Sequence, residues 1–85
     1  MAQIALIATL NSAYVLDPKQ GRATIIHPHT QKQLNLRITN IPLAKHLQAQ
    51  GLSKGDTLLI FGHLEDKTVY AKHAAIETFK GTDDG

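Results

Sequence analysis

The sequence contains no cysteine and no tryptophan, and only two tyrosines and two phenylalanines among its 85 residues. Without cysteine, neither a disulfide framework nor a thiolate metal cluster can support the fold. A chain of this length buries only about 60% of the surface that its unfolded form exposes. We therefore expect one domain with one small core over residues 1–80, followed by a flexible tail at residues 81–85.

Long apolar runs are also missing. No stretch approaches the ~20 apolar residues that a membrane-spanning helix needs, so the sequence predicts a cytoplasmic protein without a membrane partner. The phosphate-binding patterns GxGxxG and GxxxxGK[ST] are absent, and Ser12 and Ser53 lack the context of a catalytic nucleophile. The adjacent acids Glu65 and Asp66 fall in a polar turn. The sequence thus predicts a non-enzyme with no catalytic residue, no cofactor and no small-molecule substrate.

The five histidines of the chain are candidate metal ligands. His27 and His29 flank a proline, and His63 and His73 are spaced so that they can meet across a hairpin. No HExxH motif, cysteine pair or neighbouring acid completes a ligand set. We therefore expect no metal site, and histidines that are solvated or partly packed.

The charge of the chain is mildly basic. The formal net charge is +2 at pH 7 and the sequence pI is about 9.1. Asp83 and Asp84 lie in the expected tail, and without their two negative charges the rest of the chain carries +4. This bias is compatible with binding a polyanion, but it falls short of the lysine and arginine clusters that would establish such binding.

Hydrophobic alternation predicts three strands in the first half of the chain. Residues 3–16 carry apolar side chains on both faces, with a bulge expected at residues 11–13. A turn in which Gly21 can accept a positive φ leads into a second strand over residues 22–27, which a proline ends. Residues 33–39 alternate cleanly between apolar and polar side chains, so one face of this third strand is expected to be buried.

A single helix is predicted over residues 42–50. Asn40 is a suitable N-cap, because its side chain can accept a hydrogen bond from a free amide of the first turn. Pro42 is tolerated in that first turn, and Gly51 is a natural C-terminal stop. One amphipathic helix is therefore expected between the third strand and the strands that follow.

The region after the helix predicts a hairpin. Residues 58–64 and residues 68–72 have the composition of strands, and the latter segment extends toward residue 77. The polar turn at residues 65–67 joins them. Gly62 interrupts the alternation of the first strand, at a point where we expect a bulge or a bend.

The order of three strands, one helix and two strands predicts an all-β fold class with one helix. We expect the five strands to pair as an antiparallel meander, which has open edges unless it closes into a barrel, and a helix after the third strand can plug one end. The segment GDTLLIFGHL at residues 55–64 follows the pattern GDxLxIxGxL. With the element order, it resembles the oligonucleotide/oligosaccharide-binding (OB) fold, a five-stranded Greek-key barrel, over nearly the whole chain.

Chain length and strand order are similar to those of bacterial single-stranded-DNA-binding proteins and of primosomal replication protein N. The resemblance implies a cytoplasmic homo-oligomer that holds single strands during DNA replication or repair. The chain departs from these families in having no tryptophan and only four phenylalanine and tyrosine residues in total. Its acidic DDG ending also lacks the long linker and terminal phenylalanine through which such proteins recruit partners.

Binding of single-stranded nucleic acid requires flat side chains on which bases stack, interleaved with cations that follow the phosphates. If Leu58 and Ile60 face the barrel interior, Phe61 and His63 project outward from the same strand. Arginines on the second and third strands are expected to flank the residues of the last strand. The predicted nucleic-acid-binding residues are Arg22, Arg37, Phe61, His63, Tyr70 and Lys72.

Two functions are therefore open at this point. The first is non-catalytic binding of single-stranded nucleic acid on the outer face of the barrel, with single-stranded DNA favoured over RNA as the partner. The second is a protein-interaction or scaffold subunit, in which Ile26, Leu59 and Phe61 are buried against another chain, as in a homodimer. In the second reading, Phe61 and Tyr70 complete the core or an interface, and the arginines are solvated.

Overall fold

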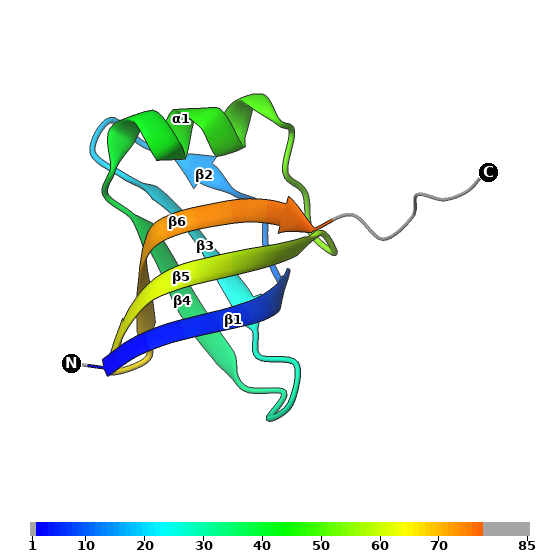
Figure 1. Ribbon diagram of the computed structural model, residues 1–85. Helices are drawn as coiled ribbons and strands as arrows, with labels where there is room; N and C mark the ends of the chain where they lie inside the picture. Colours follow the sequence, from blue (N-terminus) through cyan, green and yellow to red (C-terminus); the bar gives the residue numbers. More distant parts are fainter. Residues whose placement is uncertain (1, 78–85) are drawn as a thin grey trace.

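The computed structural model describes residues 2–77, which contain six strands and one helix (Figure 1). The elements are β1 (Ala2–Leu10), β2 (Val15–Leu16), β3 (Gly21–Ile26), β4 (Gln33–Ile38), α1 (Ile41–Ala49), β5 (Thr57–Glu65) and β6 (Thr68–Glu77). The predicted end of the domain at residue 80 and the predicted tail at residues 81–85 lie outside the described residues.

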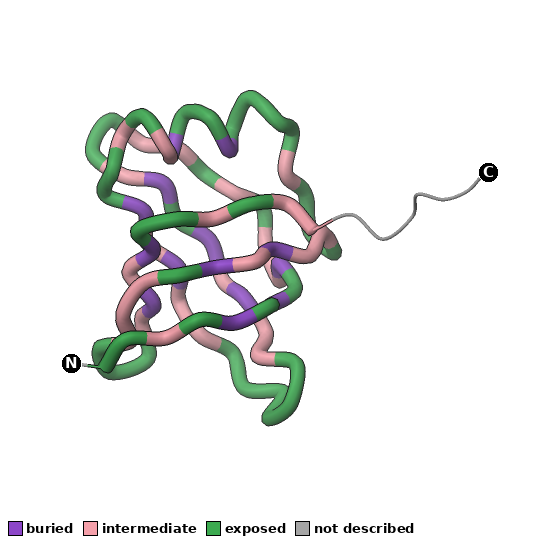
Figure 2. Tube along the Cα trace, in the orientation of Figure 1, coloured by how far each residue is buried: buried purple, intermediate pink, exposed green. Residues whose placement is uncertain are grey.

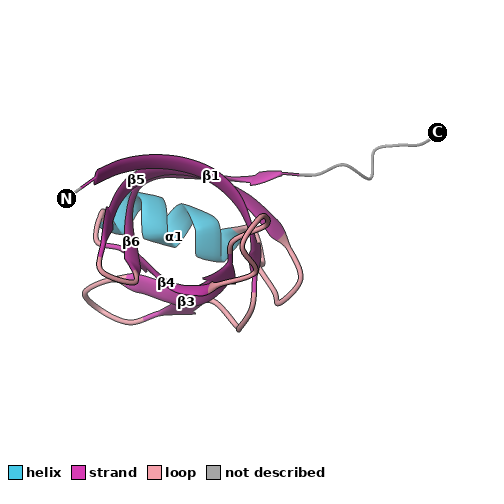
Figure 3. Cartoon of the chain, turned by 90° about the horizontal axis from the view of Figure 1, so that it is seen from below, coloured by secondary structure: helices cyan, strands magenta, loops and turns pink. Residues whose placement is uncertain are grey.

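The strands form one sheet in the order β1-β5-β6-β4-β3-β2, and a further pairing of β1 with β3 closes it into a five-stranded barrel. Thr9 and Leu10 make this closure by pairing with Ile26 and Ile25. The helix α1 lies across one end of the ring (Figure 3). The fold is an OB fold. The expectation of wholly antiparallel pairing is wrong at β4–β6, which is parallel, because β6 returns beside β4 after β5 has paired with β1.

The segment predicted as one strand over residues 3–16 is two strands, β1 and β2, on either side of residues 11–14. The predicted bulge lies within this break. Backbone contact with β3 continues through it: the amide of Asn11 donates to the carbonyl of Thr24 at 2.8 Å, and the amide of Thr24 donates to Ser12 Oγ at 3.0 Å. The chain therefore stays beside β3 while the ladder itself is interrupted.

Tyr14 explains the glycine at position 21. The Tyr14 hydroxyl donates to the carbonyl oxygen of Ala44 in α1 at 2.9 Å, which holds the ring over the start of β3. A Cβ at Gly21 would overlap the Tyr14 hydroxyl and lie 2.7 Å from its ring carbon Cζ. Gly21 does not adopt the positive φ that the turn allowed it, and close packing is what excludes a side chain there. The described glycines with positive φ are Gly51 and Gly55.

The predicted helix is confirmed, with bounds one residue earlier at each end. The Asn40 side chain accepts a hydrogen bond from the amide of Leu43 at 3.1 Å, as expected for an N-cap. Gly51 follows the helix at φ 73°, the left-handed conformation of a C-terminal stop. Ala44 and Leu47 are fully buried, so this face of α1 fills the end of the barrel.

The predicted hairpin is confirmed: β5 is one residue longer at each end than the expected 58–64, and β6 begins at residue 68 and reaches residue 77 as expected. The ladder pairs Phe61 with His73 and Gly62 with Ala71, which leaves Lys72 as an extra residue. The bulge predicted at Gly62 is therefore present, but its inserted residue lies on β6. Gly62 is required because a Cβ there would overlap the carbonyl oxygen of Tyr70 and lie 2.8 Å from Ala71 Cα.

The core occupies the barrel interior and the space beneath α1 (Figure 2). Alternate residues of each strand point into it, and Leu58 and Ile60 of β5 are fully buried, as the alternation predicted. Their neighbours on the other face of β5 point to the outside of the barrel. The large, fully buried side chains are Leu10, Ile25, Leu36, Ile38, Leu47, Leu58, Ile60 and Val69.

Candidate nucleic-acid interface

Four of the six predicted binding residues form one continuous row on the outside of the barrel. Arg22 of β3 lies opposite Arg37 of β4, and Arg37 lies beside Tyr70 of β6. Tyr70 in turn lies opposite His63 of β5. We call these four residues the outer row. It crosses β3, β4, β6 and β5 and so curves around the side of the barrel that β6 forms (Figure 3).

The aromatic end of the outer row is a stacked pair. The ring centroids of His63 and Tyr70 are 5.2 Å apart and their planes are inclined by 24°. Both residues are half-buried, so each keeps part of its surface open to solvent. His63 and His73, which the sequence spacing allowed to meet, lie apart, because the ladder pairs His63 with Tyr70 and His73 with Phe61. Two nearly parallel rings offer a flat surface of the kind on which a base stacks.

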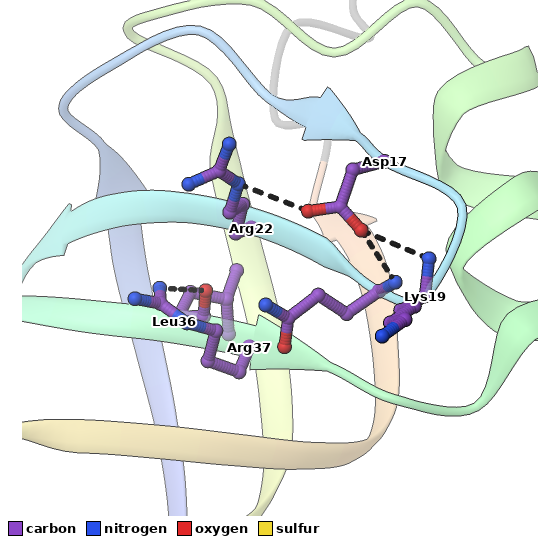
Figure 4. A network of polar contacts seen from close by, with 6 residues as sticks. Asp17, Lys19, Arg22, Leu36 and Arg37 are labelled. Atoms are coloured by element: carbon purple, nitrogen blue, oxygen red, sulfur yellow. Dashed lines mark hydrogen bonds and ion pairs between the residues drawn. The ribbon is translucent and has the colours of Figure 1, made fainter.

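The cationic end of the outer row makes one hydrogen bond to neighbouring backbone and one ion pair (Figure 4). Arg22 Nε lies 3.3 Å from Asp17 Oδ2, and the Arg22 side chain remains 51% exposed. An Nη atom of Arg37 donates to the carbonyl oxygen of Leu36 at 3.2 Å. Like charges directly opposite each other on neighbouring strands repel, so the register of β3 and β4 places two cations where they destabilise each other.

Asp17 is fixed by the turn that joins β2 to β3. Its Oδ1 accepts hydrogen bonds from the backbone amides of Lys19 at 2.9 Å and Gln20 at 3.0 Å. The hydrogen bond from Lys19 is the largest cause that lowers the pKa of Asp17, and the hydrogen bond from Gln20 and the charge of Arg22 act in the same direction. The carboxylate is therefore held in its charged form beside Arg22.

A hollow of about 320 Å³ lies over the outer faces of β3 and β4, and we call it the first hollow. Both arginines of the outer row line it. Thr24 and Asn35 are cross-strand partners next to them and add a hydroxyl and an amide, and neither was among the predicted binding residues. The alternation of residues 33–39 places Asn35 on the same face of the strand as Arg37, so the sequence pattern could have identified Asn35 as a binding residue. The remaining lining residues are Ser12, Ala13, Val15 and Ala23.

The other two predicted residues, Phe61 and Lys72, line a second hollow of about 350 Å³ beside the β5–β6 bulge. Phe61 is 45% exposed, and Lys72 is exposed because it is the inserted residue of the bulge. The second hollow shares no lining residue with the first. The structure therefore places all six predicted residues on the outer surface, but along a curved path instead of around a single groove.

The histidines of the β3–β4 loop form part of a turn. His27 Nδ1 accepts hydrogen bonds from the backbone amides of His29 at 3.1 Å and Thr30 at 3.4 Å, and the rings of His27 and His29 are 5.8 Å apart. Over residues 2–77, no three or more histidine, cysteine or acidic side chains are grouped so that they could hold a metal ion. In the same range, no helix is long and apolar enough to cross a membrane.

Comparisons with known proteins support the fold. No protein-family model matches the chain, and no curated protein sequence matches it. A similar solved structure is a chain in the crystal structure of the S. pombe Stn1–Ten1 complex, with a TM-score of 0.70 and 13% sequence identity. The alignment covers 91% of this chain and 59% of that chain, so this chain spans somewhat more than half of its length. At this identity the likeness shows a shared fold.

Proposed function

We propose that this protein binds single-stranded nucleic acid on the outside of its barrel and catalyses no reaction. The observation that carries the proposal is the unbroken outer row, in which Arg22 and Arg37 are followed on the adjacent strands by Tyr70 and His63. A single nucleic-acid strand presents phosphates and unpaired bases, so a surface that binds it combines cations with flat rings.

The order of the side chains indicates how a strand would lie. The arginines stand over the outer faces of β3 and β4, which correspond to the second and third strands of the OB barrel, the face with which OB folds bind oligonucleotides. Phosphates would lie there, and a base would stack on the Tyr70–His63 pair, with each stacked base contributing about 1–3 kcal/mol. The strand would then curve around β6 toward Phe61 and Lys72 in the second hollow.

Single-stranded DNA is proposed ahead of RNA, and a cytoplasmic location goes with it, on the strength of the resemblance to bacterial single-stranded-DNA-binding proteins. The outer row itself recognises features that both polymers share, namely phosphates and base faces. The proposed preference for DNA is tested by comparing the affinities of the protein for DNA and RNA oligomers.

A fluorescence-anisotropy titration with labelled dT and rU oligomers at two salt concentrations tests the proposal. We expect binding that weakens as salt rises, because each neutralised phosphate releases counterions. Tighter binding of dT than of rU supports the DNA preference. No binding of either oligomer at low salt would end the proposal.

A second candidate function is a protein-interaction subunit, and the exposed apolar side chains of β1 and β5 favour it. Ile7 is 42% exposed and lies opposite Leu59, while Phe61 is 45% exposed and lies opposite Ala5. We call these four residues the apolar patch; a homodimer would bury it. Light scattering of the wild type and of Phe61→Ala tests this function, since a dimer that keeps its mass in the variant argues against an interface at Phe61.

A further inference from the structure

The two arginines of the outer row lack a shared counter-anion. Arg22 and Arg37 are directly opposed across β3 and β4, and within residues 2–77 the contact with Asp17 is the one ion pair that either guanidinium makes. Arg22 makes this contact through its Nε atom, and the two terminal nitrogens of its guanidinium group point away from Asp17 (Figure 4). Both side chains line the first hollow.

The turn that joins β2 to β3 holds the negative charge of Asp17 beside Arg22. One of its oxygens is used by the amides of Lys19 and Gln20, so the other is aimed at Arg22. The turn is closed by the amide of Asp17, which donates to the carbonyl of Gln20 at 3.0 Å. The carboxylate is therefore held beside Arg22, which lines the first hollow, by the turn as well as by Arg22 itself.

We infer that the first hollow is a phosphate subsite of the nucleic-acid surface, and that Asp17 is an internal counter-anion that a phosphate of the bound strand displaces from Arg22. The inference rests on the proposed function and adds to it the position of one phosphate and the residue that competes with it. Arginine binds phosphate through two parallel N–H groups, and one phosphate bound by both arginines would offset the repulsion between these cross-strand neighbours.

The displaced carboxylate remains close to the bound phosphate, because the turn amides keep it in place. Its negative charge then opposes that of the phosphate. Asp17 thus lowers the affinity of the surface for polyanions and neutralises part of the arginine pair when no ligand is present. An asparagine at this position would accept the same two amide hydrogen bonds without the charge.

The test compares Asp17→Asn with the matched control Asp56→Asn by anisotropy with a labelled dT oligomer at low salt. Asp56 is also a turn residue whose carboxylate accepts a backbone hydrogen bond, from Ser53 at 2.9 Å, so the control makes the same change in net charge. We expect Asp17→Asn to tighten binding by about two- to five-fold, the size of an exposed charge interaction, and Asp56→Asn to change it less. Equal effects of the two variants would overturn the inference.

A second measurement needs no variant and separates the inference from the proposed function. Inorganic pyrophosphate is titrated into ¹⁵N-labelled wild-type protein while the side-chain Nε–H signals of both arginines are followed. Shifts of both signals support the phosphate subsite even if no oligomer binds, in which case the proposed function alone has failed. If neither signal, or only one, responds to pyrophosphate, the subsite is disproved.

Discussion

The ring of Tyr70 is stacked on the ring of His63, with centroids 5.2 Å apart. The contact depends on two pairings that meet at Tyr70, since β6 lies parallel to β4 on one side and antiparallel to β5 on the other. The pairing of β6 with β4 also places Arg37 beside Tyr70. A cation from β4 and a stacked aromatic pair from the β5–β6 hairpin therefore come together, although α1 separates β4 from that hairpin in the sequence.

Replacement of Tyr70 by leucine should weaken binding of a dT oligomer by about 1–3 kcal/mol, because the variant keeps an apolar side chain but loses the flat ring on which a base stacks. Anisotropy measures the change. Tyr14→Phe is the control, since Tyr14 faces α1 and donates its hydroxyl hydrogen bond to Ala44. Equal affinities of Tyr70→Leu and the wild type would show that bases do not stack there.

Replacement of Arg37 by glutamine should lower the salt dependence of binding. Each phosphate contact on a single strand contributes about 0.7 to the slope of log K against log salt, so we expect the slope to fall by about that amount. Lys45→Gln removes the same charge from the exposed side of α1 and should leave the slope unchanged. Identical slopes for both variants would contradict a phosphate contact at Arg37.

Replacement of Gly62 by alanine should destabilise the fold by about 1–3 kcal/mol, the usual range for overpacking. The new methyl group would overlap the backbone of Tyr70 and Ala71, and relief of that overlap requires a shift of β6. Urea denaturation measures the stability, and anisotropy should show weaker binding because Tyr70 moves.

Gly51→Ala serves as the control for this substitution. It also strains a backbone at positive φ, 73°, but its Cβ would have no atom within 4 Å. It should therefore lower stability without changing affinity. A Gly62→Ala protein as stable as the wild type would mean that the bulge tolerates a side chain.

The pH dependence of stability should carry the contribution of Asp17. Hydrogen bonds from the turn amides, above all that of Lys19, lower its pKa in the folded state. A lowered pKa stabilises the fold above the unfolded value of about 3.9, and this contribution is lost as the pH falls through the folded value. We expect the melting temperature of the wild type to exceed that of Asp17→Asn at neutral pH and to converge with it in acid. A difference that persists unchanged to the lowest pH would contradict this.

Local patterns in the sequence were sufficient for most of the elements. The amide-capping side chain of Asn40 and the conformational freedom of Gly51 set the bounds of the helix to within one residue. Alternation in β4 and in the first half of β5 identified which side chains face the core, because successive residues of a strand point to opposite faces. These features depend on neighbours a few residues away, so the sequence displays them directly.

Other features depend on partners far along the chain and were predicted incompletely. The role of Gly21 follows from Tyr14 and α1, which the alternation of residues does not reveal. The bulge near Gly62 was expected from the interrupted pattern of β5, whereas its inserted residue, Lys72, is fixed by the register between two strands. Register is a property of the pair and cannot be assigned from one strand alone.

The sequence by itself determined the strands, the helix and the outward direction of the residues that could bind a ligand, because periodicity, turn chemistry and capping act over a few residues. The tertiary structure decided that β1 closes on β3 and that β6 lies beside β4. The β4–β6 pairing brings Arg37 to Tyr70, and the pairing of β5 with β1 and with β6 places Phe61 and Lys72 at a separate hollow. Closure of a barrel joins residues that are dozens of positions apart, and so only the folded chain settles which side chains become neighbours.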